Sequence, residues 1–171
     1  MRFLVIAIAA CVLLVGSVGS VSAVPPDREP LVAEPLEFAA GDVCEFALLI
    51  ETTVNRGTFR TFYDRNGDVR VNLITGSGVS RYTNLETGES IELVGGGVGV
   101  LSDPGDGTFV IDARGLASFY FFPGDQTPVG EGSGLWVVSG RARSVLDLAT
   151  NVVTSFESSG RLTDICAALE G

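Results

Sequence analysis

The sequence predicts an all-β fold, an antiparallel β-barrel or β-sandwich of about 8 to 10 strands with a short C-terminal helix. From Cys44 onward, apolar and polar residues alternate in short runs that recur about every 8 to 12 residues. Glycine, asparagine and aspartate stand between these runs, as in turns. No long stretch has the roughly 3.6-residue period of an amphipathic helix, which excludes a parallel α/β fold.

Residues 1–23 have the order of parts that is typical of a secretory signal peptide. Arg2 is followed by an unbroken apolar run at residues 3–15 and by small residues up to Ala23, after which we expect cleavage. An uncleaved anchor is one alternative, but the run is shorter than the roughly 20 residues that span a bilayer. An acylated Cys11 is another, although the residues after Cys11 are apolar, whereas a lipidated cysteine begins a polar tail. We therefore expect a secreted, extracellular protein without a stable membrane span after cleavage.

Residues 24–42 form a proline-rich segment ahead of the β domain. Four of the seven prolines lie here, at Pro25, Pro26, Pro30 and Pro35, among charged residues. Because proline removes a backbone donor, we expect an extended, solvated leader without regular hydrogen bonding. The expected organisation is a signal peptide at 1–23, a leader at 24–42 and a single β domain at 43–171.

Cys44 and Cys166 are the two cysteines of the expected mature chain. Export places them in an oxidising compartment, where a bridge between them would close a loop of about 120 residues. Two free thiols are the alternative, but the chain has no histidine to activate either one. We expect a structural disulfide that ties the first strand to the last element.

The strands follow in order from Cys44. Even-numbered residues from Cys44 to Val54 share one face of a strand, after which residues 55–57 are expected to turn the chain. A strand at Phe59–Tyr63 and the turn Asp64–Asp68, with its Asn-Gly pair, predict a hairpin. Further strands are expected at residues 69–73, 79–85, 90–94, 98–101, 108–113, 116–122, 135–146 and 152–157. Residues 163–169 predict the helix, with Thr163 or Asp164 as its N-cap.

The composition excludes most catalytic chemistry. The chain contains neither histidine nor lysine, so it has no Ser–His or Cys–His couple, no imidazole metal ligand and no Schiff-base lysine. Its 21 acidic and 11 basic residues give a net charge of −10, which disfavours binding to nucleic acid. We expect no nucleic-acid partner, no cofactor and no metal site. We interpret the scattered acids as a solubilising surface, with attraction to basic partners as the alternative.

Two motifs resemble ligand loops but lack the required spacing. With Gly67 at the sixth position of a calcium loop, Phe62 and Leu73 occupy positions that need carboxylates. We therefore interpret Asp64–Asp68 as a turn. Gly95–Gly99 is not followed by a helix whose N-terminus could hold a phosphate, so we interpret it as a bulge or hairpin loop.

Paired carboxylates are the catalytic arrangement that this composition permits, because glycan hydrolases need neither histidine nor lysine. One acid of such a pair must be buried or face a cleft. Strand alternation points five acids away from the apolar faces: Glu45, Glu51, Glu92, Asp112 and Glu157. The loop acids are weaker candidates: Asp103, Asp106, Asp125 and Glu131. We assign no catalytic residue.

Residues 119–122 carry aromatic side chains on both faces of one expected strand. This pattern indicates a strand covered on both sides, by the core and by a loop, ligand or partner. A second core-facing row is predicted at Trp136, Val138, Ala142 and Leu146. Arg141 and Arg143 have the opposite parity, and we expect them to pair with surface acids.

Several short segments between residues 44 and 166 carry a family resemblance: Cys44-Glu45-Phe46, Thr61–Gly67, Tyr82–Gly88, Leu135-Trp136, Ser139–Arg141 and Asp164–Cys166. In these segments the chain resembles small secreted actinobacterial β-rich proteins of uncharacterised function. The resemblance implies a signal peptide and a β-rich domain, and it supplies no catalytic residues. The use of arginine without lysine also fits a GC-rich genome.

The leading hypothesis is a secreted, non-catalytic β domain that binds a small apolar ligand or a cell-envelope partner. It predicts a cavity inside the sheet. The alternative, a carboxylate-dependent glycan hydrolase, predicts two acids within roughly 5 to 10 Å of each other in one cleft. A third hypothesis is a structural envelope component, which would self-associate.

Overall fold

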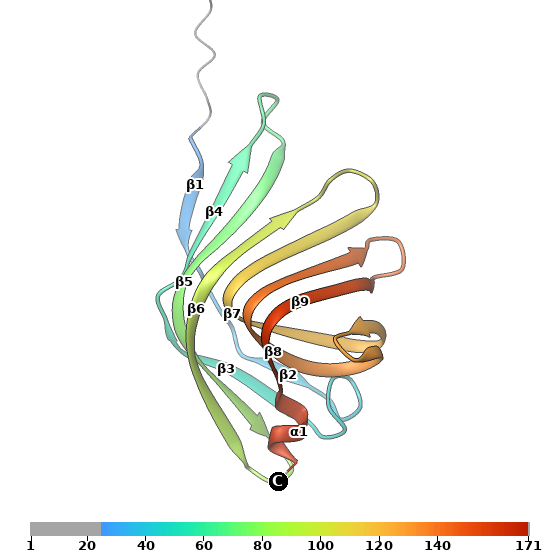
Figure 1. Ribbon diagram of the computed structural model, residues 1–171. Helices are drawn as coiled ribbons and strands as arrows, with labels where there is room; N and C mark the ends of the chain where they lie inside the picture. Colours follow the sequence, from blue (N-terminus) through green and yellow to red (C-terminus); the bar gives the residue numbers. More distant parts are fainter. Residues whose placement is uncertain (1–24, 171) are drawn as a thin grey trace, which may run out of the picture.

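The computed structural model describes residues 25–170, which form one antiparallel sheet and a short helix (Figure 1). The elements are β1 (Asp27–Pro30), β2 (Leu36–Phe38), β3 (Leu48–Asn55), β4 (Thr58–Tyr63), β5 (Val69–Asn84), β6 (Ser90–Ser102), β7 (Thr108–Thr127), β8 (Gly130–Asp147), β9 (Val152–Asp164) and α1 (Ile165–Leu169). The predicted all-β class with a short C-terminal helix is confirmed, and the nine-stranded sheet is not closed. The predicted signal peptide lies outside the described residues. Within residues 25–170, no helix is long and apolar enough to cross a membrane.

The sheet is an antiparallel meander in the order β1-β4-β5-β6-β7-β8-β9, with β2 and β3 attached beside it. One half of β5 pairs with β4 and the other half with β3, so β3 and β4 act as one interrupted strand. The predicted chain reversal at residues 55–57 is therefore wrong. Instead, Asn55 stabilises the interruption between β3 and β4. Its side chain accepts a hydrogen bond from the Gly57 amide at 2.8 Å and donates one to the Leu31 carbonyl at 2.6 Å.

The leader also differs from its prediction. Residues 25–42 are largely exposed, as expected, but they contain β1, which pairs with β4, and β2, which pairs with β3. Both strands lie at the edge of the sheet, where proline is tolerated because its missing amide need not face a neighbouring strand. Pro30 ends β1 and Pro35 immediately precedes β2.

A row of glycines crosses the sheet from strand to strand. In register, Gly76 lies opposite Gly97, then Gly115, Gly140 and Gly160 follow on successive strands. A side chain on Gly97 would overlap the carbonyl oxygen of Arg114, and a side chain on Gly115 would overlap that of Gly96. The backbones of neighbouring strands therefore approach too closely for any residue with a Cβ, and the sheet can bend here. We call these five residues the glycine line.

The interpretation of Gly95–Gly99 as a bulge or hairpin loop is wrong, since these residues lie within β6 and pair with β5 without a shift in register. The predicted break between residues 113 and 116 likewise lies within β7. The physical reason is that glycine permits a sharp bend inside a strand as well as a turn between strands.

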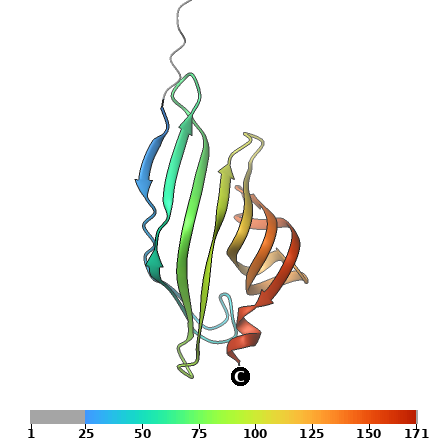
Figure 2. The same cartoon turned by 60° about the vertical axis from the view of Figure 1, so that its left-hand side comes forward.

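The sheet splits into two layers on one side of the glycine line. β6 pairs with β7 through Gly97–Ser102 and Val110–Gly115. Beyond Gly97 the start of β6 pairs with β5 alone, and beyond Gly115 the rest of β7 pairs with β8 alone. Figure 2 shows the long, flatter strands β4–β6 on one side and the curled strands β7–β9 on the other. The β7–β8 hairpin therefore folds over the inner face of the sheet, the face that carries Tyr82 and Leu93.

A buried core fills the space between these layers. It contains Val43, Cys44, Phe46, Leu48, Tyr82, Leu135, Val137, Ile165, Cys166 and Leu169. We call this part of the molecule the closed half, and we call the part beyond the glycine line, which includes β4 and the β6–β7 and β8–β9 turns, the open half.

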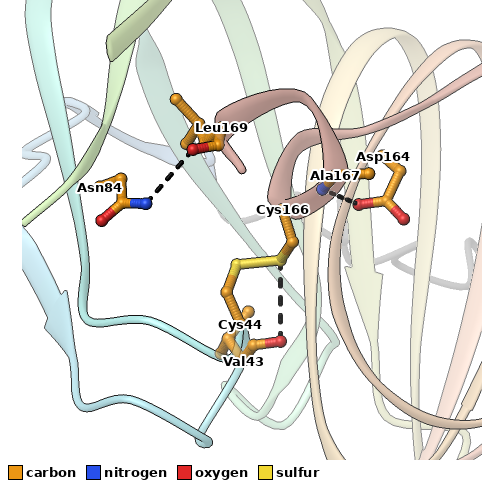
Figure 3. The surroundings of a disulfide bond; sticks show 7 residues. All are labelled: Val43, Cys44, Asn84, Asp164, Cys166, Ala167 and Leu169. Atoms are coloured by element: carbon orange, nitrogen blue, oxygen red, sulfur yellow. Dashed lines mark hydrogen bonds between the residues drawn. A yellow bond between two sulfur atoms is a disulfide. The ribbon is translucent and has the colours of Figure 1, made fainter. Parts of the chain in front are cut away.

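The disulfide fastens the closed half (Figure 3). Cys44, just before β3, is bonded to Cys166 in α1, and their Cα atoms are 5.5 Å apart. The predicted disulfide and the predicted cap are both confirmed, because Asp164 accepts a hydrogen bond from the Ala167 amide at 3.1 Å. The buried side chain of Asn84 donates to the Leu169 carbonyl at 3.2 Å, which ties the end of β5 to the helix.

A second core lies between the β7–β8 hairpin and β9. The rings of Phe119 and Phe121 each lie 5.1 Å from the ring of Phe156. On the opposite face of β7, Tyr120 and Phe122 pack against Phe38 of β2. The prediction that this aromatic strand is covered on both sides is thus confirmed only for the face of Phe119 and Phe121; on the other face Tyr120 is 46% and Phe122 40% exposed despite the contact with Phe38. The predicted row of core residues is confirmed in part: Val138 and Ala142 belong to this second core and Trp136 packs against it, whereas Leu146 is half-buried and lines the cleft described below.

Candidate functional site

A cleft of about 630 Å³ lies on the inner face of the sheet. Its lining begins at Leu31 and Ala33, between β1 and β2, crosses β5, β6 and β7, and reaches Asn151 and Val153 at the start of β9. Small-molecule sites typically have volumes of about 300 to 1,000 Å³. The cleft therefore has the size expected of a ligand site, and it lies where the second layer of the closed half ends.

The floor of the cleft is backbone. Gly76 and Gly78 of β5 and Gly95, Gly97 and Gly99 of β6 contribute to its lining. Close approach to a neighbouring strand explains Gly97, but it does not explain Gly99. A Cβ added at Gly99 would meet only the Ile74 side chain, at an ordinary distance of 3.7 Å. Glycine at position 99 is therefore not required for the packing of the strands, and the absence of a side chain there leaves space in the cleft.

The walls of the cleft are apolar. Ile74, Leu101 and Ile111 lie on the side of the open half. Phe119 and Phe121, held by Phe156, face them from the folded-over β7–β8 hairpin. Half-buried aliphatic side chains opposite fixed aromatic rings are the usual lining of sites that bind apolar molecules.

A pair of hydroxyl groups forms the main polar feature between the two layers. Tyr82 of β5 is 2% exposed, and its hydroxyl oxygen lies 2.5 Å from Oγ of Ser118 on β7. Both residues contribute to the lining of the cleft. One of the two hydroxyl protons bridges the pair. Ser118 is exposed whereas Tyr82 is buried, so the Ser118 hydroxyl is the group that a ligand in the cleft can reach. This pair can bind a hydroxyl or a carbonyl group.

Asp125 is the acidic residue of the described cleft lining, and its role is structural. It is 4% exposed, and its two oxygens accept hydrogen bonds from the amides of Phe122 and Val153, each at 2.7 Å. These bonds hold the irregular end of β7 against the start of β9, because a carboxylate bonds strongly to two backbone amides. From the sequence, Asp125 is one of the loop acids, and its position four residues after Phe121 gives no signal of these two partners.

Arg114 is the other charged residue of the lining, but its side chain belongs to the outer face. It alternates with the buried Ala113 and also borders a shallow groove on the outside of the sheet, together with Arg141 and Arg143. The carbonyl group of Arg114 is the part that approaches the glycine floor. Within residues 25–170, the cleft therefore presents no free charged side chain to a ligand.

The remaining candidate acids lie away from the cleft. Glu92 forms an ion pair with Arg81 at 2.7 Å, and Asp112 forms one with Arg143 at 2.9 Å, which confirms the pairing predicted for Arg143. Arg141 has no ion pair among the described residues. The other acids considered from the sequence do not line the cleft: Glu45, Glu51, Asp103, Asp106, Glu131 and Glu157. The described lining does not supply the second carboxylate that the hydrolase alternative requires.

The acidic loops form turns. Oδ1 of Asp64 accepts hydrogen bonds from the amides of Asn66 at 2.7 Å and Asp68 at 3.0 Å, so the turn predicted at Asp64–Asp68 is confirmed. Asp106 accepts hydrogen bonds from the Thr108 hydroxyl and amide, which lower the pKa of its carboxyl group. No cluster of three or more potential metal ligands occurs within residues 25–170.

No protein-family model, no curated protein and no solved structure matches this chain. The resemblance to secreted actinobacterial proteins stays a prediction. The residues that line the cleft are therefore the basis for a functional proposal.

Proposed function

We propose that this protein is an exported β domain that binds a small apolar molecule in the cleft on the inner face of its sheet. The observation that carries the proposal is a cleft of about 630 Å³ with aliphatic and aromatic walls and a floor of glycine backbone. Transfer of apolar ligand surface from water into such a site is favourable by roughly 25 cal/mol per Å². Export is part of the proposal, supported by the apolar N-terminal run and by the disulfide, because disulfides persist in oxidising compartments.

The polar groups of the cleft favour binding over chemical conversion. The Tyr82–Ser118 pair can orient a ligand, and the Asp125 carboxylate is already engaged with two backbone amides. A general base needs a free proton-accepting group within hydrogen-bond reach of the substrate. We infer a role in carrying or sequestering the ligand.

A variant that fills the cleft tests this function. Gly99→Phe adds a ring above the floor, at a position where Cβ meets no backbone atom. Val94→Phe is the matched control, because Val94 lies on the same strand, is 79% exposed and does not line the cleft. Binding of the neutral dye Nile red to the purified protein is followed by fluorescence, and urea unfolding verifies that all three proteins are folded.

We expect the wild type and Val94→Phe to bind the dye equally, and we expect the affinity of Gly99→Phe to fall at least about tenfold, a loss of about 1.4 kcal/mol. Equal binding by Gly99→Phe, or no binding by the wild type, would refute the proposal. Native mass spectrometry of protein purified from its own host then identifies any retained small molecule. Self-association without a retained ligand would instead support the structural envelope role.

A further inference from the structure

We propose that the natural ligand is an uncharged amphiphile that binds to the Tyr82–Ser118 pair through a hydroxyl or carbonyl group. This inference rests on the proposed function and goes beyond it by naming the chemical class. Three properties of the cleft carry it: the absence of a free charge among its described lining residues, its apolar walls and the position of its hydroxyl pair.

The charged residues of the cleft lining exclude ionic ligands. A buried ion without a partner is strongly disfavoured, so sites for anions or cations supply an opposite charge. Among the described residues, the lining contains only Asp125, whose oxygens are occupied, and Arg114, whose side chain lies on the outer face. The net charge of −10 further disfavours an anion. A neutral ligand is the one that this lining accommodates without an electrostatic cost.

The walls of the cleft indicate an apolar body for the ligand. Ile74, Leu101 and Ile111 lie on one side, and Phe119 and Phe121 lie on the other. The lining crosses the curled sheet from the β3–β4 interruption to the start of β9. A volume of about 630 Å³ lies within the roughly 300 to 1,000 Å³ of small-molecule sites.

The hydroxyl pair provides a polar anchor where the two layers meet. Tyr82 comes from the first layer and Ser118 from the folded-over hairpin, so their contact fixes the position of the anchor. The other uncharged polar side chains of the lining come from the strands of the sheet and from Asn151, and they include Thr52, Thr75 and Ser144. An uncharged amphiphile with a hydroxyl or carbonyl group at the pair matches this lining.

A series of ligands with equal chain length tests the charge. Dodecan-1-ol, dodecanoate and dodecyltrimethylammonium, each below its micellar concentration, compete with Nile red for the purified protein. We expect dodecan-1-ol to displace the dye at a concentration at least about tenfold lower than either ion, because only the ions bury an unpaired charge. Displacement by either ion at the same or a lower concentration overturns the inference. In that case dye binding and its loss in Gly99→Phe still uphold the proposed function, so the two failures are distinguishable.

The anchor is tested with Ser118→Ala and with 1-chlorododecane, a ligand of similar shape without a hydroxyl proton. Loss of one neutral hydrogen bond corresponds to a decrease in dodecan-1-ol affinity of about three- to tenfold. The affinity for 1-chlorododecane should stay within about twofold, because that ligand makes no such bond. An equal effect on both ligands, or no effect on either, contradicts the assignment of the anchor. Unfolding by urea confirms that the variant is folded.

Discussion

The two halves of the molecule are built from the same long strands, but they are filled to different extents: the second core reaches the open half only through Ala113, Ala142 and the side chains packed against them. In the closed half, the β7–β8 hairpin and α1 lie over the inner face of the sheet, and Leu48, Tyr82 and Ile165 are almost completely buried. In the open half, Ile74, Leu101 and Ile111 continue the same apolar face but remain half-buried beside the cleft. Apolar and polar residues alternate along the strands of both halves. The difference comes from the second layer, which ends at the glycine line.

The difference between the two halves indicates which side chains a ligand would cover and stabilise. A molecule in the cleft would cover Ile74, Leu101 and Ile111, as the hairpin covers the corresponding face of the closed half. Anything that binds the folded state alone stabilises it by mass action. The open half should therefore gain the most protection from hydrogen exchange when the ligand binds.

Removal of the disulfide should have the largest effect, and it should act through the closed half. The bridge joins residues separated by 122 positions, so the chain-entropy relation gives a loss of about 4 to 5 kcal/mol in the free energy of unfolding for Cys44→Ala/Cys166→Ala. Urea unfolding of this variant and of the oxidised wild type measures the loss. Hydrogen exchange should show faster opening at Leu48 and Tyr82. An unchanged free energy of unfolding would show that the closed half does not depend on its bridge.

The glycine line should be the next most sensitive feature, and two glycines of β6 provide a matched pair. Gly97→Ala places a methyl group against the Arg114 carbonyl, so we expect a loss of about 2 to 3 kcal/mol in the free energy of unfolding. Gly99→Ala meets only the Ile74 side chain, so its effect should lie within about 1 kcal/mol and be stabilising, because alanine restricts the unfolded chain. Chemical unfolding of both variants tests the difference. Similar values for the two would argue against a close approach at the glycine line.

The smallest effect should come from acid titration at the tip of the open half. The amides of Ala149 and Thr150 and the Thr150 hydroxyl donate to Asp147, and these bonds lower the pKa of its carboxyl group. A lowered pKa in the folded state means that this stabilisation is present above the ordinary value of 3.8 and is lost as the pH falls through the lowered pKa. Asp147→Asn should therefore flatten the decrease in Tm between about pH 4 and about pH 2. The exposed acid variant Glu157→Gln is the control; a Tm curve for Asp147→Asn that parallels the wild type would contradict this assignment.

Local patterns in the sequence predicted the parts of the fold that depend on local chemistry. Alternation from Cys44 to Val54 predicted β3, the Asn-Gly pair predicted the turn at Asp64–Asp68, and the acidic residue before Ile165 predicted the cap of α1. The glycine line could not be predicted in this way. Its residues are far apart in the chain, and they form a row only through the register of five strands. In the sequence alone, each glycine resembles a turn.

Local sequence patterns likewise predicted only a part of the candidate site. The aromatic residues of both parities at 119–122 correctly indicated aromatic contacts on both faces of the strand, although Tyr120 and Phe122 stay exposed. The contact of Tyr82 with Ser118 could not be seen, because it arises only when β7 leaves β6 and folds across β5. The role of Asp125 depends on the same fold, since Val153 is 28 residues away along the chain. The cleft is thus a property of the bend in the sheet and not of any motif.

The covalent link between Cys44 and Cys166 also determines how the protein responds to proteases. These two residues enclose β3 through β9, including the exposed turn at residues 103–107. A single cut anywhere between them leaves both fragments attached to each other through sulfur. Such a nicked molecule would keep both pieces together under non-reducing conditions and would separate into two pieces only after reduction, so a single cut in a turn would not release half of the chain.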